Sequence, residues 1–236
     1  MNERYIKWYM PWLSREFEVL VFGNGGGLPL VLFLTSGARY YENKDFGLVG
    51  AVAWHIDNGK VTVYCPDAIA LESLYNKSIH PADRMWTHNA YENVIVRDVF
   101  DLARRECNSH RVAVCSASLG AYHAANIAFR HPDAVSHLIS LSGSFDIRSF
   151  FHGYHDDNIY FNSPYEYLPN MPDPWKYNHM AIIIGTGESD VTRDESYRLS
   201  AVLNSKGIKH WLDDGKWRGH DSNYWQDMLP YYLSLL

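Results

Sequence analysis

A serine, a carboxylate and a histidine lie in three turns of this chain where they could act together. Ser118 lies in the run Cys115-Ser116-Ala117-Ser118-Leu119-Gly120, in which a β-branched apolar stretch leads into a small-x-Ser-x-Gly turn. Such a strand-to-helix turn is typical of a nucleophile elbow, which exposes the serine hydroxyl. A serine becomes a nucleophile only when a base and an oxyanion hole accompany it. Ser116 occupies a position where glycine is usual, and a plain turn of small residues would give the same pattern.

The acid and the base are expected in loops that follow later strands. In serine hydrolases built on a parallel sheet, the nucleophile, the acid and the histidine follow one another in that order, at the carboxyl ends of strands. Asp190 comes after the apolar run 181–184, and His220 comes after the next strand. His220 would accept the proton of Ser118, and Asp190 would orient the imidazole. The order and the loops together predict Ser118, Asp190 and His220 as catalytic residues.

Other carboxylates could supply the acid. Glu188 lies in the same loop as Asp190, and Asp146 follows another strand, although an N-cap role fits Asp146 better. Asp221, next to His220, is expected to cap the final helix.

The oxyanion hole needs two backbone N–H groups. One is expected from Leu119, the residue after the nucleophile. The other is expected from Ser36 or Gly37, because the loop after the strand 30–34 is rich in small residues and allows a close approach of backbone to substrate.

Short apolar runs alternate with helix-like segments along the whole chain. Strands are predicted at 16–22, 30–34, 61–65, 112–115, 137–141, 181–184 and 209–212, and helices at 44–57, 82–106, 121–130, 193–204 and 224–236. This alternation predicts an α/β fold, a mostly parallel sheet with helices on both faces. The strands 16–22 and 30–34 are expected to form an antiparallel N-terminal hairpin. Residues 1–236 are predicted to form one domain, with an irregular, aromatic-rich excursion at about 150–178.

Composition excludes several classes of function. The chain has 236 residues and a formal net charge of −6, which argues against nucleic acid or an anionic membrane as the partner. No apolar run approaches a membrane span and no signal peptide is recognised. Cys65, Cys107 and Cys115 show no pairing or metal spacing, which indicates free thiols and a cytoplasmic location. No cofactor is expected, and the two histidines at 152–157 lack further ligands, so no metal is expected either.

The chain resembles bacterial serine esterases of the α/β-hydrolase superfamily, in the esterase D and feruloyl-esterase-like branch. The resemblance covers most of the chain and rests on four segments. They are 33–40 after the early strand, 118–126 at the elbow, 157–164 in the excursion and 219–221 near the end. The resemblance implies a carboxylesterase with Ser118 as nucleophile and His220 as base, and it favours Asp190 over Glu188. Ser116 and Ser189 depart from the family's usual glycine and aromatic residue.

We therefore expect a serine carboxylesterase that hydrolyses short-chain acyl esters through an acyl-enzyme on Ser118. Its partner would be a small-molecule ester, and Tyr160, Phe161 and Trp175 in the excursion are expected to bind it. A carbohydrate acetylesterase is an alternative, since aromatic rings stack on sugars. A non-catalytic binding protein with the same fold is another. A homo-oligomer built through the aromatic C-terminal helix also stays open.

Overall fold

One eight-stranded sheet runs through residues 1–236, which the computed structural model describes in full. The strand order is β1-β2-β4-β3-β5-β6-β7-β8, and β3 to β8 all pair in parallel. The strands are β1 (Glu3–Met10), β2 (Arg15–Phe22), β3 (Leu28–Leu32), β4 (Val61–Pro66), β5 (Val112–Ala117), β6 (Val135–Leu141), β7 (Ala181–Ser189) and β8 (Trp211–Gly219). The prediction of a mostly parallel sheet with an antiparallel N-terminal hairpin is confirmed.

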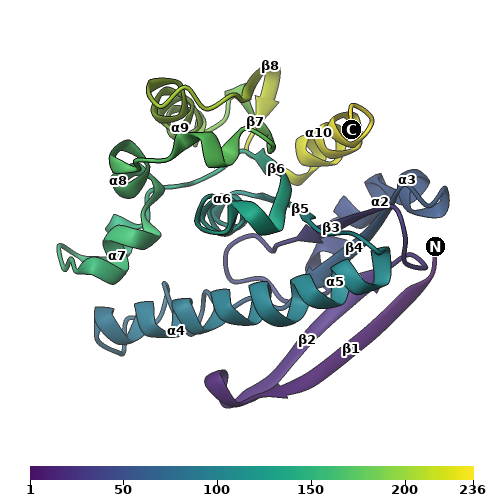
Figure 1. The fold of residues 1–236 in the computed structure, drawn as a ribbon, viewed down its shortest axis with the longest axis horizontal. Helices are drawn as coiled ribbons and strands as arrows, with labels where there is room; N and C mark the ends of the chain where they lie inside the picture. The colour runs from purple at the N-terminus through teal and green to yellow at the C-terminus, as the bar shows by residue number, and fades with distance from the viewer.

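Helices cover both faces of the sheet (Figure 1). The larger core lies under α4 (Pro81–Val94), α5 (Phe100–Cys107), α6 (Leu119–Arg130) and α9 (Arg193–Ser205). The smaller core lies under α2 (Leu48–Ala51), α3 (Ala53–Asp57) and α10 (Ser222–Leu233), with α1 (Glu42–Asp45) just before α2. Of two short helices, α7 (Asp157–Asn162) lies beside α4, and α8 (Pro164–Tyr167) lies beside α6 and α9. None of these helices is both long and apolar enough to cross a lipid bilayer.

The central strands are buried on both faces, which explains why their sequences are continuous apolar runs. Every residue of β4 and of β5 is buried, and so are Leu30, Val31 and Leu32 of β3. Ser118 follows β5 directly, so the most deeply buried strand of the sheet carries the candidate nucleophile at its carboxyl end.

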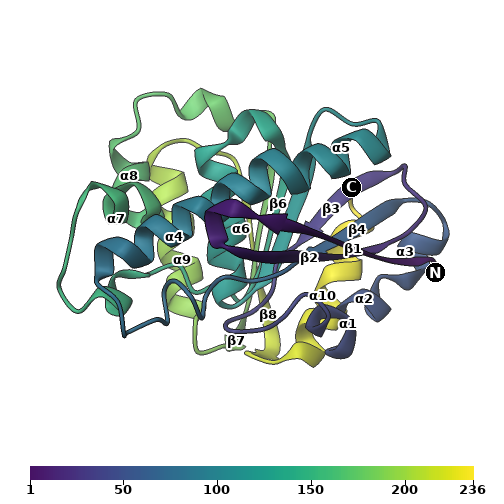
Figure 2. The same ribbon diagram turned by 90° about the horizontal axis from the view of Figure 1, so that it is seen from below.

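The N-terminal hairpin is formed by different strands from those predicted. β2 pairs with β1 on one side and with β4 on the other, whereas β3 lies between β4 and β5. The prediction that 16–22 pairs with 30–34 is therefore wrong. The strand β1 escaped prediction because its residues alternate between exposed and half-buried, as expected for an outer strand, and few of them are aliphatic. Figure 2 shows this hairpin beside the long helical run of α4 and α5.

Two predicted helices are interrupted. The segment 44–57 is divided into α1, α2 and α3, and the break after α1 falls at Gly47, whose φ of 80° ends a helix without strain. The segment 82–106 contains a π-helical turn at Ile95–Val99 between α4 and α5. The predicted excursion contains α7, α8 and three 3₁₀ turns, at Arg148–Phe151, Leu168–Asn170 and Pro174–Tyr177.

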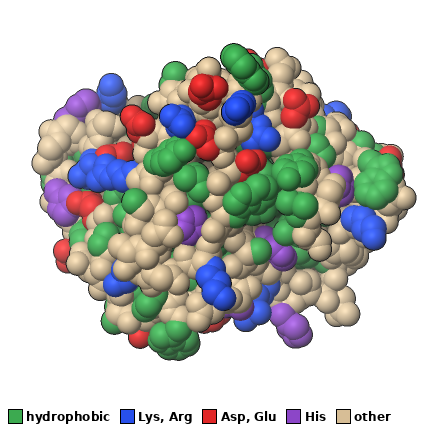
Figure 3. Space-filling view, turned by 90° about the horizontal axis from the view of Figure 1, so that it is seen from above, with side chains coloured by type: hydrophobic (Ala, Val, Ile, Leu, Met, Phe, Trp, Pro, Cys, Tyr) green, Lys and Arg blue, Asp and Glu red, His purple; other side chains and the backbone are tan.

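The outer strand β8 and the neighbouring α10 form a face with both apolar and charged side chains. Trp211, Trp217 and Tyr231 are exposed there, and the ring of Trp211 lies edge-on to that of Tyr231. Figure 3 shows hydrophobic side chains gathered on the face seen from above, with acidic and basic side chains among them. Charged residues along an edge strand oppose sheet-to-sheet aggregation.

Asp67, which follows β4, connects the hairpin to the loop after β3. Its carboxylate is fully buried, and it accepts hydrogen bonds from Arg15 Nη1 at 2.8 Å and Arg39 Nε at 2.9 Å. It also accepts one from the backbone N–H of Tyr40 at 3.3 Å. A buried carboxylate is stable only when its oxygens are satisfied in this way. The ion pairs thus fix the loop that carries Ser36 and Gly37 against the sheet.

We predict that Asp67→Asn lowers the free energy of unfolding by about 2 kcal/mol, because the two arginines lose a charged acceptor. Urea unfolding followed by circular dichroism measures this. Asp57→Asn is the control, since the Asp57 carboxylate is 52% exposed and pairs only with the N-terminus; it should change stability by less than about 0.5 kcal/mol. Equal stability of the two variants would contradict the structural role of Asp67.

Candidate active site

The backbone of Ser118 is held in a strained turn between β5 and α6. Its φ is 55° and its ψ is −130°, a region that side-chain-bearing residues rarely adopt. Hydrogen bonds hold it there: its N–H donates to Leu141 O at 3.0 Å, and its carbonyl accepts from the N–H groups of Ser144 and Ala121 at 3.1 Å each. Two of these partners belong to β6 and the loop after it, so the neighbouring strand maintains the strain.

Ser116 fits at the position where glycine is usual. Its hydroxyl donates to the carbonyl of Phe33 at 2.8 Å, and its side chain is 1% exposed. The space for it exists because Gly120 has no side chain: a Cβ at Gly120 would lie 2.1 Å from Ser116 Oγ and 2.3 Å from Leu34 O. At the elbow, β5, α6 and the end of β3 therefore still approach one another closely, and Ser116 adds a hydrogen bond to this contact.

The structure brings Ser118, His220 and Asp190 together in one hydrogen-bonded chain. The distance from His220 Nε2 to Ser118 Oγ is 2.9 Å, and that from His220 Nδ1 to Asp190 Oδ1 is also 2.9 Å. An ionised carboxylate only accepts, so Nδ1 carries the proton and Nε2 is left to accept from the serine hydroxyl. The ring of Trp225 lies edge-on to the imidazole at 5.3 Å between centroids.

Asp190 is buried and remains ionised. Burial by itself raises the pKa of a carboxyl, but hydrogen bonds from His220, Ser142 and Thr192 outweigh it and hold the pKa of Asp190 well below its ordinary value. The backbone N–H and the hydroxyl of Thr192 each donate to Oδ1 at 2.9 Å, and Thr186 Oγ1 donates to Oδ2 at 3.1 Å. The carboxylate is thus charged and fixed in orientation.

The other carboxylates considered as the acid lie elsewhere. Glu188 is exposed, and Asp146 pairs with Arg148 and Arg198. Asp146 also accepts from the backbone N–H of Arg148, a local turn contact. Asp221 caps α10, as predicted, by accepting from the N–H of Asn223 at 2.8 Å.

Three side chains that support the acid were not predicted. Thr186, Thr192 and Ser142 contact Asp190, and the Ser142 hydroxyl also accepts from Trp225 Nε1 at 3.0 Å. A small hydroxyl residue near a strand end is too common to be recognised in a sequence. The only available signal was that all three lie in or beside the strand ends that carry the triad.

The loop after β3 lies beside the elbow. Leu34 O is the atom that a Cβ at Gly120 would meet, and Asn43 Nδ2 donates to the carbonyls of Leu32 and Phe33 at 3.0 Å each. The N–H groups of Ser36 and Gly37, further along this loop, donate to no backbone carbonyl. Leu119 is the first residue of α6, where an N–H has no acceptor within the helix. These N–H groups are free to bind an oxyanion.

The three aromatic residues predicted to bind substrate lie at the other end of α6. The guanidinium of Arg130 donates to the carbonyl of Phe161, and helix rise places Arg130 about 18 Å from Ser118. Tyr160 and Phe161 line a cavity of about 730 Å³ that no triad residue lines. The turn that holds Trp175 contacts Pro132–Ala134, just beyond α6. These three aromatic residues lie away from Ser118, which corrects the prediction that they bind substrate there.

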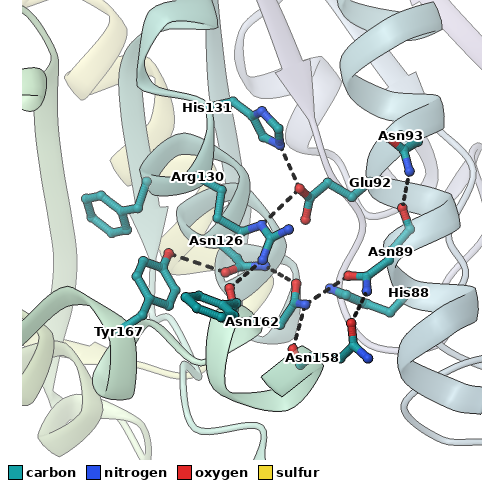
Figure 4. A network of polar contacts seen from close by, with 12 residues as sticks. His88, Asn89, Glu92, Asn93, Asn126, Arg130, His131, Asn158, Asn162 and Tyr167 are labelled. Atoms are coloured by element: carbon teal, nitrogen blue, oxygen red, sulfur yellow. Dashed lines mark hydrogen bonds and ion pairs between the residues drawn. The ribbon is translucent and has the colours of Figure 1, made fainter. Parts of the chain in front are cut away.

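A network of amide side chains attaches α7 at that distant position (Figure 4). Asn162 donates to Asn89 Oδ1 of α4 at 2.9 Å, and Asn126 of α6 donates to Asn162 Oδ1 at 2.9 Å. Asn89 donates in turn to Asn158 at 3.1 Å. The conformation of the excursion is therefore set by partners on α4 and α6.

No other chemistry-bearing cluster competes with this site. No three His, Cys, Asp or Glu side chains come together in a geometry that could hold a metal ion. All three cysteines are buried and unbonded, and burial raises the pKa of the Cys65 thiol to about 12. Cys115 lies within β5 and is fully buried, so it cannot replace Ser118 as nucleophile.

Comparisons with known proteins agree with this architecture. The model of the family described as "Putative esterase" matches residues 28–234. A ferulic acid esterase structure has a TM-score of 0.78 at 16% identity, covering 99% of this chain and 97% of the other. An S-formylglutathione hydrolase from Staphylococcus aureus has a TM-score of 0.76 at 15% identity, covering 99% and 96%. A fluorophosphonate-binding serine hydrolase of that organism has a TM-score of 0.78 at 14% identity, covering 99% and 97%. No curated protein matches the sequence.

We predict that Gly120→Ala destabilises the protein by about 3 kcal/mol, because the new methyl group overlaps Ser116 Oγ and the backbone oxygen of Leu34. The double variant Ser116→Gly with Gly120→Ala should not recover, since the backbone overlap persists. Gly50→Ala in α2 is the control: nothing lies within 4 Å of a Cβ there, so it should not destabilise the protein and could stabilise it by up to about 1 kcal/mol. Urea unfolding midpoints test this, and a stable Gly120→Ala would contradict the close approach.

Proposed function

The chain belongs to the esterase family whose model covers residues 28–234, and we propose that Ser118, His220 and Asp190 are the catalytic triad of this carboxylic ester hydrolase. The observation that carries the proposal is the unbroken chain of two 2.9 Å hydrogen bonds from Ser118 Oγ through the imidazole to Asp190. A base within this distance of a serine hydroxyl can remove its proton during attack.

In the first half of the reaction, Ser118 Oγ attacks the ester carbonyl carbon while its proton passes to His220 Nε2. The carbonyl oxygen becomes an oxyanion, which Leu119 N–H and one N–H of Ser36 or Gly37 would stabilise. The charged, fixed Asp190 stabilises the imidazolium through Nδ1–H. Collapse of the intermediate breaks the ester C–O bond, and His220 gives its proton to the departing alcohol. The product is an acyl-enzyme on Ser118.

In the second half, water takes the place of the alcohol. His220 accepts one proton from the water as its oxygen attacks the acyl carbon, and the same N–H groups hold the new oxyanion. Collapse releases the carboxylic acid, and the proton on His220 returns to Ser118 Oγ. The enzyme is regenerated with no cofactor.

We also propose short-chain acyl esters as substrates, because the site is shallow. The side chain of His220 is 21% exposed and Ser118 is partly exposed. Neither residue lines any of the five main cavities of the structure. A long acyl chain would lie on the surface with little of its apolar area buried, so each added methylene would contribute little to binding.

A fluorophosphonate probe tests the nucleophile. We expect the probe to label the native protein covalently at Ser118 and the labelled peptide to be found by mass spectrometry. Ser118→Ala should not be labelled and should not hydrolyse 4-nitrophenyl acetate. Ser116→Ala, two residues away, is the control and should still be labelled. Labelling that survives in Ser118→Ala would refute the assignment.

The acid is tested by comparing two neighbouring carboxylates. We expect Asp190→Asn to lower kcat for 4-nitrophenyl acetate about 10⁴-fold, because the amide no longer selects the imidazole tautomer that leaves Nε2 free. Glu188→Gln changes an exposed residue two positions before Asp190, at the end of β7, and kcat should stay within about twofold. The assignment of the acid fails if Glu188→Gln, or Asp146→Asn, shows the large loss instead.

A further inference from the structure

Two exposed tryptophans line a groove on the side of α4 away from the active site. Trp12 lies in the 3₁₀ turn Pro11–Leu13 between β1 and β2, and Trp86 lies in the second turn of α4. Their side chains are 64% and 60% exposed, and both line one cavity of about 280 Å³. Single exposed apolar residues are ordinary on protein surfaces, but two indoles facing one hollow form a patch.

Local packing explains why both indoles face the solvent. Met10 is buried and Leu13 packs against the core, so the turn between them is anchored and Trp12 is directed outward. On α4, Met85 is fully buried, and Trp86 follows it on the outer surface.

The groove exists because the side chains that follow Trp86 on the same face of α4 are short. Ala90 and Val94 follow Trp86 at intervals of four residues, so they lie on the same face of the helix, and both line the cavity. They are short side chains, which leaves a hollow beside the indoles.

The far end of the groove is formed by the π-helical turn Ile95–Val99. Arg97 and Asp98 belong to this turn, and both line the cavity. Neither side chain forms a hydrogen bond or an ion pair with the rest of the protein, so their donors and acceptors are available. Asn93 uses its amide nitrogen on the carbonyl of Asn89 and keeps its amide oxygen free. A π-helical turn interrupts the regular helix hydrogen bonding and is frequent at functional sites.

We propose that the Trp12–Trp86 groove binds a carbohydrate chain at the protein surface. Two indoles provide flat apolar faces on which the C–H faces of pyranose rings can stack. The free groups of Asn93, Arg97 and Asp98 provide both donors and acceptors for sugar hydroxyls. One cation and one anion leave the groove without net charge, which suits a neutral polyhydroxyl ligand.

The charge distribution argues against a nucleic acid on these indoles. Bases also stack on aromatic side chains, but such sites lie in positively charged grooves that follow the phosphate backbone. Here Arg97 has Asp98 beside it, and the chain carries a net charge of −6.

The ligand is inferred to be a chain because a second cavity adjoins the groove. Asn89 lines both this groove and the 730 Å³ cavity, where Phe161 is 55% exposed. A saccharide of several residues could follow both hollows, whereas a single ring would occupy one. Such a site would hold a polymer on the enzyme and raise the local concentration of its ester groups. This inference does not depend on the proposed triad.

Binding is tested with β-1,4-linked xylohexaose and cellohexaose, whose rings present flat C–H faces. We expect tryptophan fluorescence to change on titration with at least one of them, and migration of the native protein to be retarded in a gel that contains soluble xylan. Trp12→Ala and Trp86→Ala should each weaken binding about tenfold, and the double variant should abolish it. Trp54→Ala is the matched control, because that indole on α3 is 63% exposed and lines neither the groove nor the 730 Å³ cavity; its affinity should be unchanged.

Hydrolysis of 4-nitrophenyl acetate by every variant should equal that of the native protein, which also shows that each variant folds. The proposal fails if the native protein binds neither hexasaccharide nor xylan, or if the double variant binds as well as the native protein. It also fails if light scattering finds a native dimer that the double variant dissociates, because a second copy would then occupy the groove. None of these results bears on Ser118, whose test is probe labelling.

Discussion

The candidate site depends on one strained residue, Ser118, whose backbone is held in place by β6 and the loop after it. Its N–H bonds to the end of β6 and its carbonyl accepts from the loop beyond, so φ stays at 55° although serine gains nothing locally from that conformation. The strain directs the hydroxyl toward His220 and places Leu119 N–H at the free end of α6. Gly120 then allows the end of β3 to approach the elbow at Leu34 O, and the loop of Ser36 and Gly37 continues from there.

The charge of Asp190 is also maintained by groups at the carboxyl ends of the strands. Asp190 is buried, and a buried carboxylate would ordinarily be neutralised. It keeps its charge because three hydroxyl side chains and one backbone N–H, from the ends of β6 and β7 and the loop after β7, converge on its two oxygens. Ser142 accepts from Trp225, and the ring of Trp225 lies against the imidazole, so the histidine is positioned by α10 as well as by the acid.

Two sequence predictions were wrong for the same physical reason: each depended on which elements a segment packs against. The segment 16–22 pairs with β1 and β4 because β3 is enclosed by β4 and β5, and alternation of apolar residues reveals a strand without naming its neighbour. The aromatic excursion was expected to bind substrate at Ser118, yet Phe161 contacts Arg130, about twelve residues further along α6, and Asn162 contacts α4. Long connections near a strand end are often functional, but their direction is decided by contacts that composition does not reveal.

The sequence by itself determined the fold class, the turn that holds Ser118 and the two loops that hold Asp190 and His220, because each is a local pattern tied to a strand end. It favoured Asp190 among the carboxylates at 146, 188 and 190 but left the other two open, because the three differ in burial and in partners. The tertiary structure places Asp190 2.9 Å from the imidazole, whereas Asp146 pairs with arginines. It also decided what no motif records: the hydroxyls around the acid and the groove that two distant tryptophans form together. Such features depend on residues that meet only when the chain has folded, and no local pattern specifies them.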